Sequence, residues 1–329
     1  MENLKVGVIG VGHLGQHHAR IYSTLPGVVL VGVSDQDAAR NRQIAEQFQV
    51  PGYNDYQDLL WHVDAVSVAV PTSLHGEVVR QCLNRGIHVL VEKPLASTIS
   101  EGRGMVDFAR EKGVRLQVGH VERFNPVLDI VRPILDQPAF IQCNRLAPYQ
   151  TRGTDVDVVL DLMIHDIDIV LSWGLGPVAK VEAYGAMVMS KHNDFVSAQV
   201  EFKRGCMAEF TVSRVSTSRL RNLCLFQPNL YLAADYQTRQ GMLYRKVETD
   251  WGSVMVVEEP LKGGSEDALT RELAAFTRSV RDGVDHGVSG EEGLLALELA
   301  FEVLAVIKKN EMQAEKKKSI ARAVSIELS

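Results

Sequence analysis

The first 120 residues alternate short apolar runs with stretches that repeat apolar residues at helical spacing. Runs that are apolar throughout are typical of strands buried on both faces, and helical segments between them are typical of crossovers in a parallel sheet. We therefore expect a doubly wound α/β arrangement here. The expected strands span residues 4–10, 28–35, 65–70, 88–94 and 114–120, and the expected helices span 13–25, 37–48, 73–85 and 97–112.

The pattern changes after about residue 121. Two partly alternating segments flank the turn Lys203-Arg204-Gly205, which indicates a β-hairpin. The strand-like segments lie at 140–147, 179–188, 194–202, 206–215 and 221–257, and the helical ones at 266–283 and 290–309. We expect an α+β domain with a large, mostly antiparallel sheet. The chain then divides into a first domain, 1–120, and a second domain for substrate binding and oligomerisation, 121–329.

Composition and charge narrow the class of protein. The net charge is −6 and the pI about 5.9, whereas nucleic-acid binders usually carry a basic domain or stripe, so we expect no nucleic-acid partner. No apolar run is long enough to span a bilayer, and the first apolar run is interpreted as a strand. The four cysteines show no CxxC spacing, which favours free thiols. We expect a soluble cytoplasmic protein with no membrane partner.

A glycine-rich turn follows the first expected strand, with the sequence Gly10-Val11-Gly12-His13-Leu14-Gly15. Between a strand and a helix, GxGxxG is typical of the dinucleotide-binding turn of a Rossmann domain. Gly10 permits the tight turn, Gly12 lets a pyrophosphate approach the backbone, and Gly15 lets helix and strand pack closely. The helix N-terminus attracts the phosphates. We expect this turn, His13 and Leu14 included, to bind the cofactor; the alternative is an ordinary glycine-rich connection.

An acidic residue stands where the second strand is expected to end. Asp35 lies twenty residues after Gly15, where an acid accepts hydrogen bonds from the adenosine ribose. Its carboxylate would repel a 2′-phosphate, so NAD is preferred over NADP. Asp37 is a competing candidate, but it better fits the first turn of the next helix. Arg40 keeps NADP open as an alternative.

Ligands of open α/β sheets bind beyond the carboxyl ends of the strands. The later strands lead there to Pro71, Thr72 and His75, and to Glu92 and Lys93, so we expect these residues at the cofactor site. Lys93 ends an apolar strand and precedes a proline, which holds it at a rigid position facing the cleft. A surface loop lysine and a structural His75 are the alternatives.

The stretch Val159–Leu171 is apolar enough for a buried helix, yet it contains ionisable side chains. At about 100° per residue, one narrow stripe of this helix and the turn before it holds Asp157, Asp161, His165 and Asp168. Asp166 falls outside the stripe, where it would bind a backbone group or face a gap. A carboxylate one turn from an imidazole can orient it and raise its basicity, which suits proton removal during hydride transfer to nicotinamide.

Other interpretations of this stretch compete. The pair His165-Asp166 is similar to one found in metal phosphohydrolases, but those enzymes use further histidines on other helices, and the glycine turn would stay unexplained. A purely structural buried network is a second alternative. The chain contains no GxSxG motif, which argues against serine-type hydrolysis.

Taken together, GVGHLG, EKP and DxxxHxxD resemble the Gfo/Idh/MocA family of NAD(P)-dependent oxidoreductases, over the whole chain and including GHVERFNP at the domain junction. The resemblance implies that Lys93, Asp161 and His165 contact substrate and nicotinamide, with the histidine as acid/base. The reverse assignment, with Lys93 as the base, stays open. A homodimer or homotetramer built through the exposed face of the second domain's sheet is also implied. Many members carry a glycine pair before this helix, where this chain has Gly153–Asp157.

The segment DVDVVLDLMIHDIDIVL is most similar to a subgroup that resembles UDP-N-acetylglucosamine 3-dehydrogenases. This similarity implies NAD-dependent oxidation of a sugar hydroxyl to a ketone, at C3 of a UDP-N-acetyl-amino sugar. The residues that could meet a nucleotide-sugar phosphate are Arg123, Asn125, Tyr149 and Arg152. The alternatives are a cyclitol or simple-sugar dehydrogenase and a non-catalytic NAD-binding regulator, although a regulator needs no acid/base stripe.

Overall fold

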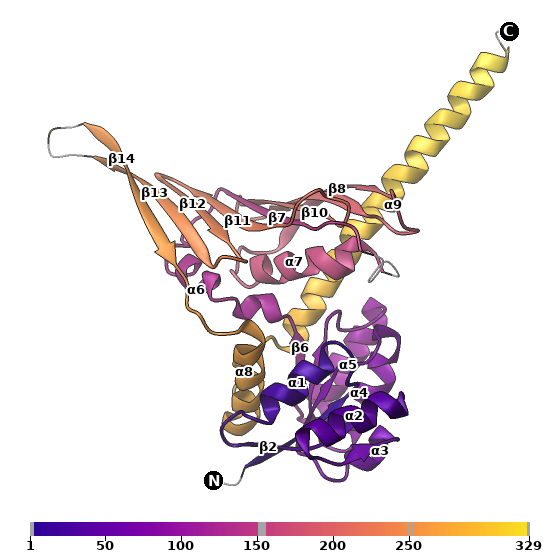
Figure 1. Cartoon of the computed structure of the whole chain (residues 1–329). Helices are drawn as coiled ribbons and strands as arrows, with labels where there is room; N and C mark the ends of the chain where they lie inside the picture. The colour runs from indigo at the N-terminus through magenta and orange to yellow at the C-terminus, as the bar shows by residue number, and fades with distance from the viewer. Residues whose placement is uncertain (1–2, 151–155, 249–250, 252, 328–329) are drawn as a thin grey trace. The chain divides into compact units, whose positions relative to one another are not determined.

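The computed structural model of the chain (Figure 1) describes residues 3–150, 156–248, 251 and 253–327, and of residues 317–327 it describes the backbone alone. The chain forms two compact units. The first unit combines Met1–Pro126 with Ser265–Leu297, and the second combines Val127–Gly264 with Glu298–Ser329.

The first unit is built on a six-stranded sheet of parallel strands in the order β3-β2-β1-β4-β5-β6. The strands are β1 Leu4–Ile9, β2 Val28–Ser34, β3 Gly52–Tyr53, β4 Ala65–Val68, β5 His88–Glu92 and β6 Leu116–Gly119. The helices are α1 Gly15–Tyr22, α2 Ala38–Phe48, α3 Tyr56–Leu59, α4 His75–Asn84, α5 Ile99–Lys112 and α8 Ala268–Asp282. The expected doubly wound sheet is confirmed. Its strand order reverses between β1 and β4, so ligands should bind beyond the carboxyl ends of these strands.

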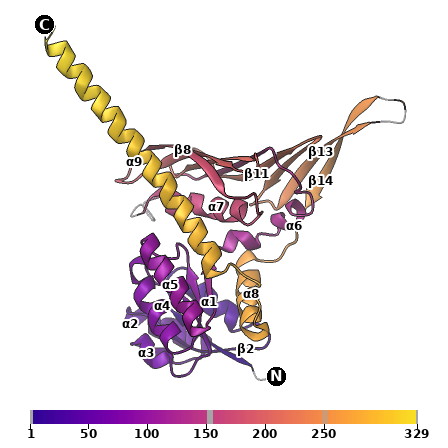
Figure 2. The same ribbon diagram turned by 180° about the vertical axis from the view of Figure 1, so that it is seen from behind.

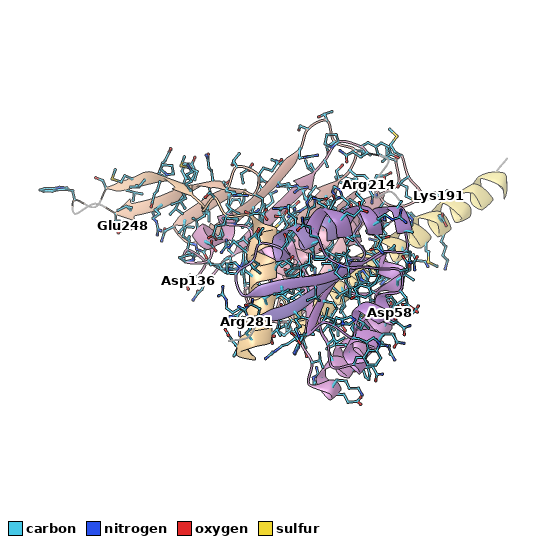
Figure 3. The ribbon with its side chains drawn as sticks, turned by 60° about the horizontal axis from the view of Figure 1, so that its bottom comes forward. Asp58, Asp136, Lys191, Arg214, Glu248 and Arg281 are labelled. Carbon is cyan, nitrogen blue, oxygen red and sulfur yellow. The ribbon has the colours of Figure 1, made fainter. Side chains whose placement is uncertain are left out.

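Helix α8 completes the first unit although it comes late in the chain. Its Leu273 and Phe276 are fully buried in the apolar cluster formed by β1, β2 and α1. Arg281 of α8, labelled in Figure 3, donates a hydrogen bond to the Gly27 carbonyl before β2. The first unit is therefore larger than the expected domain ending at residue 120. An amphipathic pattern shows that a helix buries one face, but not which part of the chain covers it.

The second unit is built on an eight-stranded sheet in the order β14-β13-β12-β11-β7-β10-β9-β8. Within the described strands of this sheet, only β7 and β10 pair in parallel, so the expected mostly antiparallel sheet is confirmed. The strands are β7 Phe140–Leu146, β8 Val178–Ala186, β9 Phe195–Phe202, β10 Met207–Ser213, β11 Leu220–Gln227, β12 Leu230–Asp235, β13 Gln240–Glu248 and β14 Val254–Lys262. The short helix α6, Val127–Val131, precedes them.

One face of the second sheet is apolar and carries the helix of the expected site. Val196 and Ala198 of β9 lie opposite Val212 and Phe210 of β10, and all four side chains are buried. Helix α7, Ile164–Leu171, and the π-helical turn before it lie along this face (Figure 1). The sheet therefore fixes the position of α7 within this unit.

The opposite face of this sheet carries a row of aromatic rings. Neighbouring centroids lie 5.9, 4.9 and 5.7 Å apart along Phe140, Phe226, Tyr231 and Tyr244. The edge strand β14 is exposed along nearly its whole length, with Val256 62% exposed. This face is the one expected to build an oligomer, and that expectation stays a prediction.

Helix α9, Gly290–Glu327, is longer than the expected 290–309. Residues 310–327 contain no glycine or proline and are rich in good helix formers, so nothing in them stops the helix. Asn310 donates a hydrogen bond to the Ala183 carbonyl, which ties α9 to the edge strand β8 (Figure 2). Of the helices described, none is both long enough and apolar enough to cross a membrane.

Candidate active site

The glycine turn joins β1 to α1, and its three glycines are constrained differently. Gly10 has a φ of +84°, and a Cβ there would lie 2.6 Å from the Ala69 carbonyl oxygen. A Cβ on Gly15 would overlap the Gly10 carbonyl oxygen. At Gly12, by contrast, the nearest atom is Nη1 of Arg40 at 3.9 Å, so the space beside the backbone is open. This combination of a tight turn and an open backbone fits a pyrophosphate, and hence NAD.

Asp35 lies directly at this turn. Its carboxylate accepts hydrogen bonds from the backbone N–H of Val11 at 2.9 Å and of Asp37 at 2.8 Å, and Arg40 lies 3.4 Å away. Asp37 instead caps α2 by accepting from the N–H groups of Ala39 and Arg40, as its alternative role predicts. The bond from the Arg40 N–H lowers the pKa of Asp37. Asp35 is therefore the acid beside the cofactor turn.

His75 is buried inside the first unit, where both of its ring nitrogens lie at backbone carbonyls. The ring is 1% exposed, with Nδ1 3.0 Å from the Pro94 carbonyl oxygen and Nε2 3.0 Å from that of Val70. Burial lowers the pKa of this imidazole. The ring thus connects the segment that follows β4 to the segment that follows β5. This contact is consistent with the structural role that the sequence left as an alternative for His75. Pro71 is exposed and Thr72 half-buried in the turn before α4.

Lys93 follows β5 and is half-buried. The Glu92 side chain before it turns inward, where its carboxylate lies 3.0 Å from His18 Nε2 and accepts the Lys93 N–H at 3.3 Å. This carboxylate is therefore held within the first unit by His18 and by the main chain of Lys93. No pattern in the sequence singles out His18. The feature of the sequence that could have indicated His18 is its place three residues after Gly15, on the side of α1 that packs on the sheet.

The helix of the expected stripe is not uniform. Val159–Met163 form a π-helical turn before α7 begins at Ile164. Asp157 accepts hydrogen bonds from the Val159 N–H at 2.9 Å and from Asn193 Nδ2 at 2.7 Å. Because a π turn advances by a smaller angle per residue than an α turn, one constant angle does not relate Asp157 to the residues that follow. Asp157 therefore fixes the start of the helix.

The remaining members of the stripe differ in exposure. Asp161 is half-buried in the π turn, whereas His165 is 9% and Asp168 1% exposed in α7. Asp161 precedes His165 by one turn, the spacing at which a carboxylate can orient an imidazole. Exposure falls along the helix, so the end at Asp161 is the one that a ligand can reach.

Asp166 is paired with a buried arginine. Its carboxylate accepts two hydrogen bonds from Arg145 of β7, from Nε at 3.1 Å and from Nη2 at 2.8 Å, and both residues are at most 2% exposed. The Arg145 guanidinium also lies 5.4 Å from the Tyr236 ring centroid. Asp166 therefore does not face a gap, because the sheet supplies a cation. The signal in the sequence is an arginine at an inward position of an alternating strand, which requires a buried acid.

The described part of the chain contains no group of three or more histidine, cysteine, aspartate or glutamate residues placed so that they could hold a metal ion. A metal at His165 and Asp166 would need the Asp166 carboxylate. Both of its oxygens already bond to Arg145. These contacts favour an acid/base role for His165 over a metal-binding role.

The residues expected to contact a nucleotide-sugar phosphate differ in their partners and in their exposure. Arg123 forms an ion pair of 2.7 Å with Glu292, and Asn125 donates to a glutamate of the same turn. Both are thus engaged within the first unit. Tyr149 is 41% exposed, and Arg152 lies outside the described residues, as does most of the segment 153–157 that replaces the glycine pair.

The chain is similar to known proteins over most of its length. Residues 4–120 match a model of an oxidoreductase family with an NAD-binding Rossmann fold, and residues 138–226 match the Gfo/Idh/MocA C-terminal domain. UDP-N-acetylglucosamine 3-dehydrogenase of Acidithiobacillus ferrooxidans is 32% identical over 302 residues, which cover 90% of this chain and 96% of that protein. The chain belongs to the Gfo/Idh/MocA family.

The structure of the same enzyme and the sequence of an inositol dehydrogenase are also similar to this chain. The solved structure of the A. ferrooxidans enzyme has a TM-score of 0.88 at 29% identity and covers 94% of this chain and 99% of its own. The scyllo-inositol 2-dehydrogenase (NAD(+)) of Bacillus subtilis is 28% identical over 233 residues, 65% of this chain and 68% of that protein. The predicted family, enzyme class and NAD cofactor are confirmed: this Gfo/Idh/MocA protein is an NAD-binding oxidoreductase.

Proposed function

We propose that the protein oxidises the C3 hydroxyl of a UDP-N-acetyl-amino sugar to a ketone, with NAD as the hydride acceptor. The observation that supports this substrate is the similarity to UDP-N-acetylglucosamine 3-dehydrogenase over 96% of that protein's length. The acid/base chemistry is supported by the imidazole of His165, held in an apolar helix with Asp161 one turn before it.

The proposed mechanism divides the reaction among three side chains. Bound NAD supplies the acceptor for the hydride that leaves the carbinol carbon. His165 takes the hydroxyl proton, and Asp161 orients the imidazole. Lys93 stabilises the negative charge that develops on the oxygen. In the reverse assignment, Lys93 takes the proton and His165 donates a hydrogen bond.

We assign the cofactor to the carboxyl edge of the first sheet. The turn Gly10–Gly15, with His13 and Leu14 in it, would hold the pyrophosphate, and Asp35 the adenosine ribose. Pro71 and Thr72 would lie beside the cofactor at the end of β4. The support is the open backbone at Gly12 and the position of Asp35 at the same turn.

NAD is expected to bind at least about tenfold tighter than NADP, because a 2′-phosphate would meet the Asp35 carboxylate. Titration calorimetry at matched concentrations measures this ratio. The Asp35→Ser variant should narrow this ratio, whereas Asp37→Ser keeps a capping side chain at the start of α2 and should leave the ratio unchanged. Equal affinities in the wild-type protein would count against the assignment of Asp35 to the ribose.

A substrate screen tests the proposed reaction, with NADH absorbance as the signal. UDP-N-acetylglucosamine is expected to give the highest kcat/KM among UDP-sugars, free sugars and inositols. A cyclitol dehydrogenase is the second candidate, favoured by the similarity to scyllo-inositol 2-dehydrogenase. A higher kcat/KM with an inositol would replace the proposed substrate. Tight NAD binding without turnover of any sugar would favour a regulator.

A further inference from the structure

A buried side-chain pair lies within the first unit beside Lys93. His18 of α1 and Glu92 of β5 are 1% and 9% exposed, with His18 Nε2 3.0 Å from Glu92 Oε1. The other ring nitrogen of His18 has no hydrogen-bond partner among the described residues, so Glu92 is the polar group that holds this ring. Burying such groups is costly unless they are paired.

The second carboxylate oxygen of Glu92 reaches the main chain at Lys93. It accepts the Lys93 N–H at 3.3 Å. On the far side stands Gly119 of β6, where a Cβ would lie 3.1 Å from the Glu92 carboxyl carbon, so the carboxylate fits closely against the neighbouring strand. Burial alone would raise the pKa of Glu92, but the bond to His18 and the charge of Lys93 lower it, which keeps the group a carboxylate.

His18 also belongs to the helix that starts at the cofactor turn. Helix α1 begins at Gly15, and His18 lies one turn along it. A continuous connection thus runs from the glycine turn through His18 and Glu92 to the backbone of Lys93. We propose that His18 and Glu92 are positioning residues, which couple the cofactor turn to Lys93 and set where its ammonium group acts. This inference rests on the proposed role of Lys93.

A neighbouring pair on the same helix supplies a matched control. Tyr22 lies one turn beyond His18, and its hydroxyl is 2.8 Å from Ser67 Oγ of β4, with both residues fully buried. This pair also joins α1 to the sheet, but it does not reach Lys93. The Tyr22→Phe variant therefore loosens the same helix without touching the proposed connection.

The test compares His18→Leu, His18→Gln, Glu92→Gln and Tyr22→Phe by steady-state kinetics and thermal unfolding. His18→Leu is expected to lower kcat by about 10–100-fold, the size of effect that a small misplacement of a catalytic group produces, with the KM for the sugar unchanged. His18→Gln keeps an N–H donor for Glu92 and should recover most of the loss. Glu92→Gln should lower kcat in the same direction. Tyr22→Phe should reduce the melting temperature without reducing kcat.

Three results would overturn the proposal. The first is a kcat for His18→Leu equal to that of Tyr22→Phe, and the second is a loss of kcat in His18→Gln as large as in His18→Leu. The third is a rate of Lys93 acylation in His18→Leu that equals the wild-type rate. Acylation is followed by mass spectrometry with acetic anhydride and needs no substrate. If the wild-type protein oxidises none of the sugars, the proposed function fails, and the Lys93 acylation rates still decide the positioning role.

Discussion

Replacing His165 with alanine is expected to lower kcat by about 10²–10⁴-fold, the usual contribution of general acid–base catalysis. The imidazole is proposed to take the hydroxyl proton, and the variant leaves no side chain in α7 that can do so at the same place. NADH formation with saturating sugar and NAD measures the loss. Because His165 is 9% exposed, its removal also leaves space for a small base, so added imidazole should restore part of the rate.

The control for this variant is His192→Ala, which removes an exposed histidine from the same unit and should leave kcat unchanged. NAD affinity should be the same in both variants, since the assigned cofactor residues all belong to the first unit. A much smaller loss in His165→Ala than in Lys93→Ala would favour the reverse assignment, with Lys93 as the base and His165 as the hydrogen-bond donor. Unchanged turnover in His165→Ala would remove His165 from both assignments.

The second large effect is expected from Asp166→Ala, which should lose about 3–5 kcal/mol of unfolding free energy, because it removes the carboxylate that accepts two hydrogen bonds from a buried guanidinium. Arg145 is 2% exposed, so water cannot replace the lost hydrogen bonds without opening the interface between α7 and the sheet. Urea unfolding followed by fluorescence measures the change.

A double variant distinguishes the cost of leaving one charge of the pair without the other from the cost of removing both charges. Arg145→Met with Asp166→Leu removes both charges and keeps apolar volume, so its unfolding free energy should lie close to that of the wild type. If Asp166→Ala lost less than about 1 kcal/mol, the pair would behave as a solvent-screened one and this account of the interface would be wrong.

The sequence predicts best where the structural signal is local. The strands of the first sheet are mostly apolar, and the glycine turn follows the first of them, so both the sheet and its cofactor edge are predictable. Strand β3 and helix α3 are missed, because a two-residue strand and a single helical turn are too short to show a period.

Partners that lie far apart in the chain are the least predictable part of the site. The inward-facing Arg145 and Asp166 of the helix each suggest a buried opposite charge, but sequence spacing does not show that they meet. The inward turn of Glu92 toward His18 is hidden for the same reason. A constant angle of 100° per residue does not describe the start of the segment Val159–Leu171, because Val159–Met163 form a π turn, which advances by a smaller angle per residue.

The composition of the first unit from two chain segments also determines when it can fold during synthesis. Its last strand ends at Gly119, but Leu273 and Phe276, which close its core, are made roughly 150 residues later. At about 5–20 residues per second, a ribosome needs roughly 10–30 s to make them. During this interval the apolar surface that α8 will cover stays open to the nascent chain and to chaperones. The unit that begins first is therefore among the last parts of the protein to become stable.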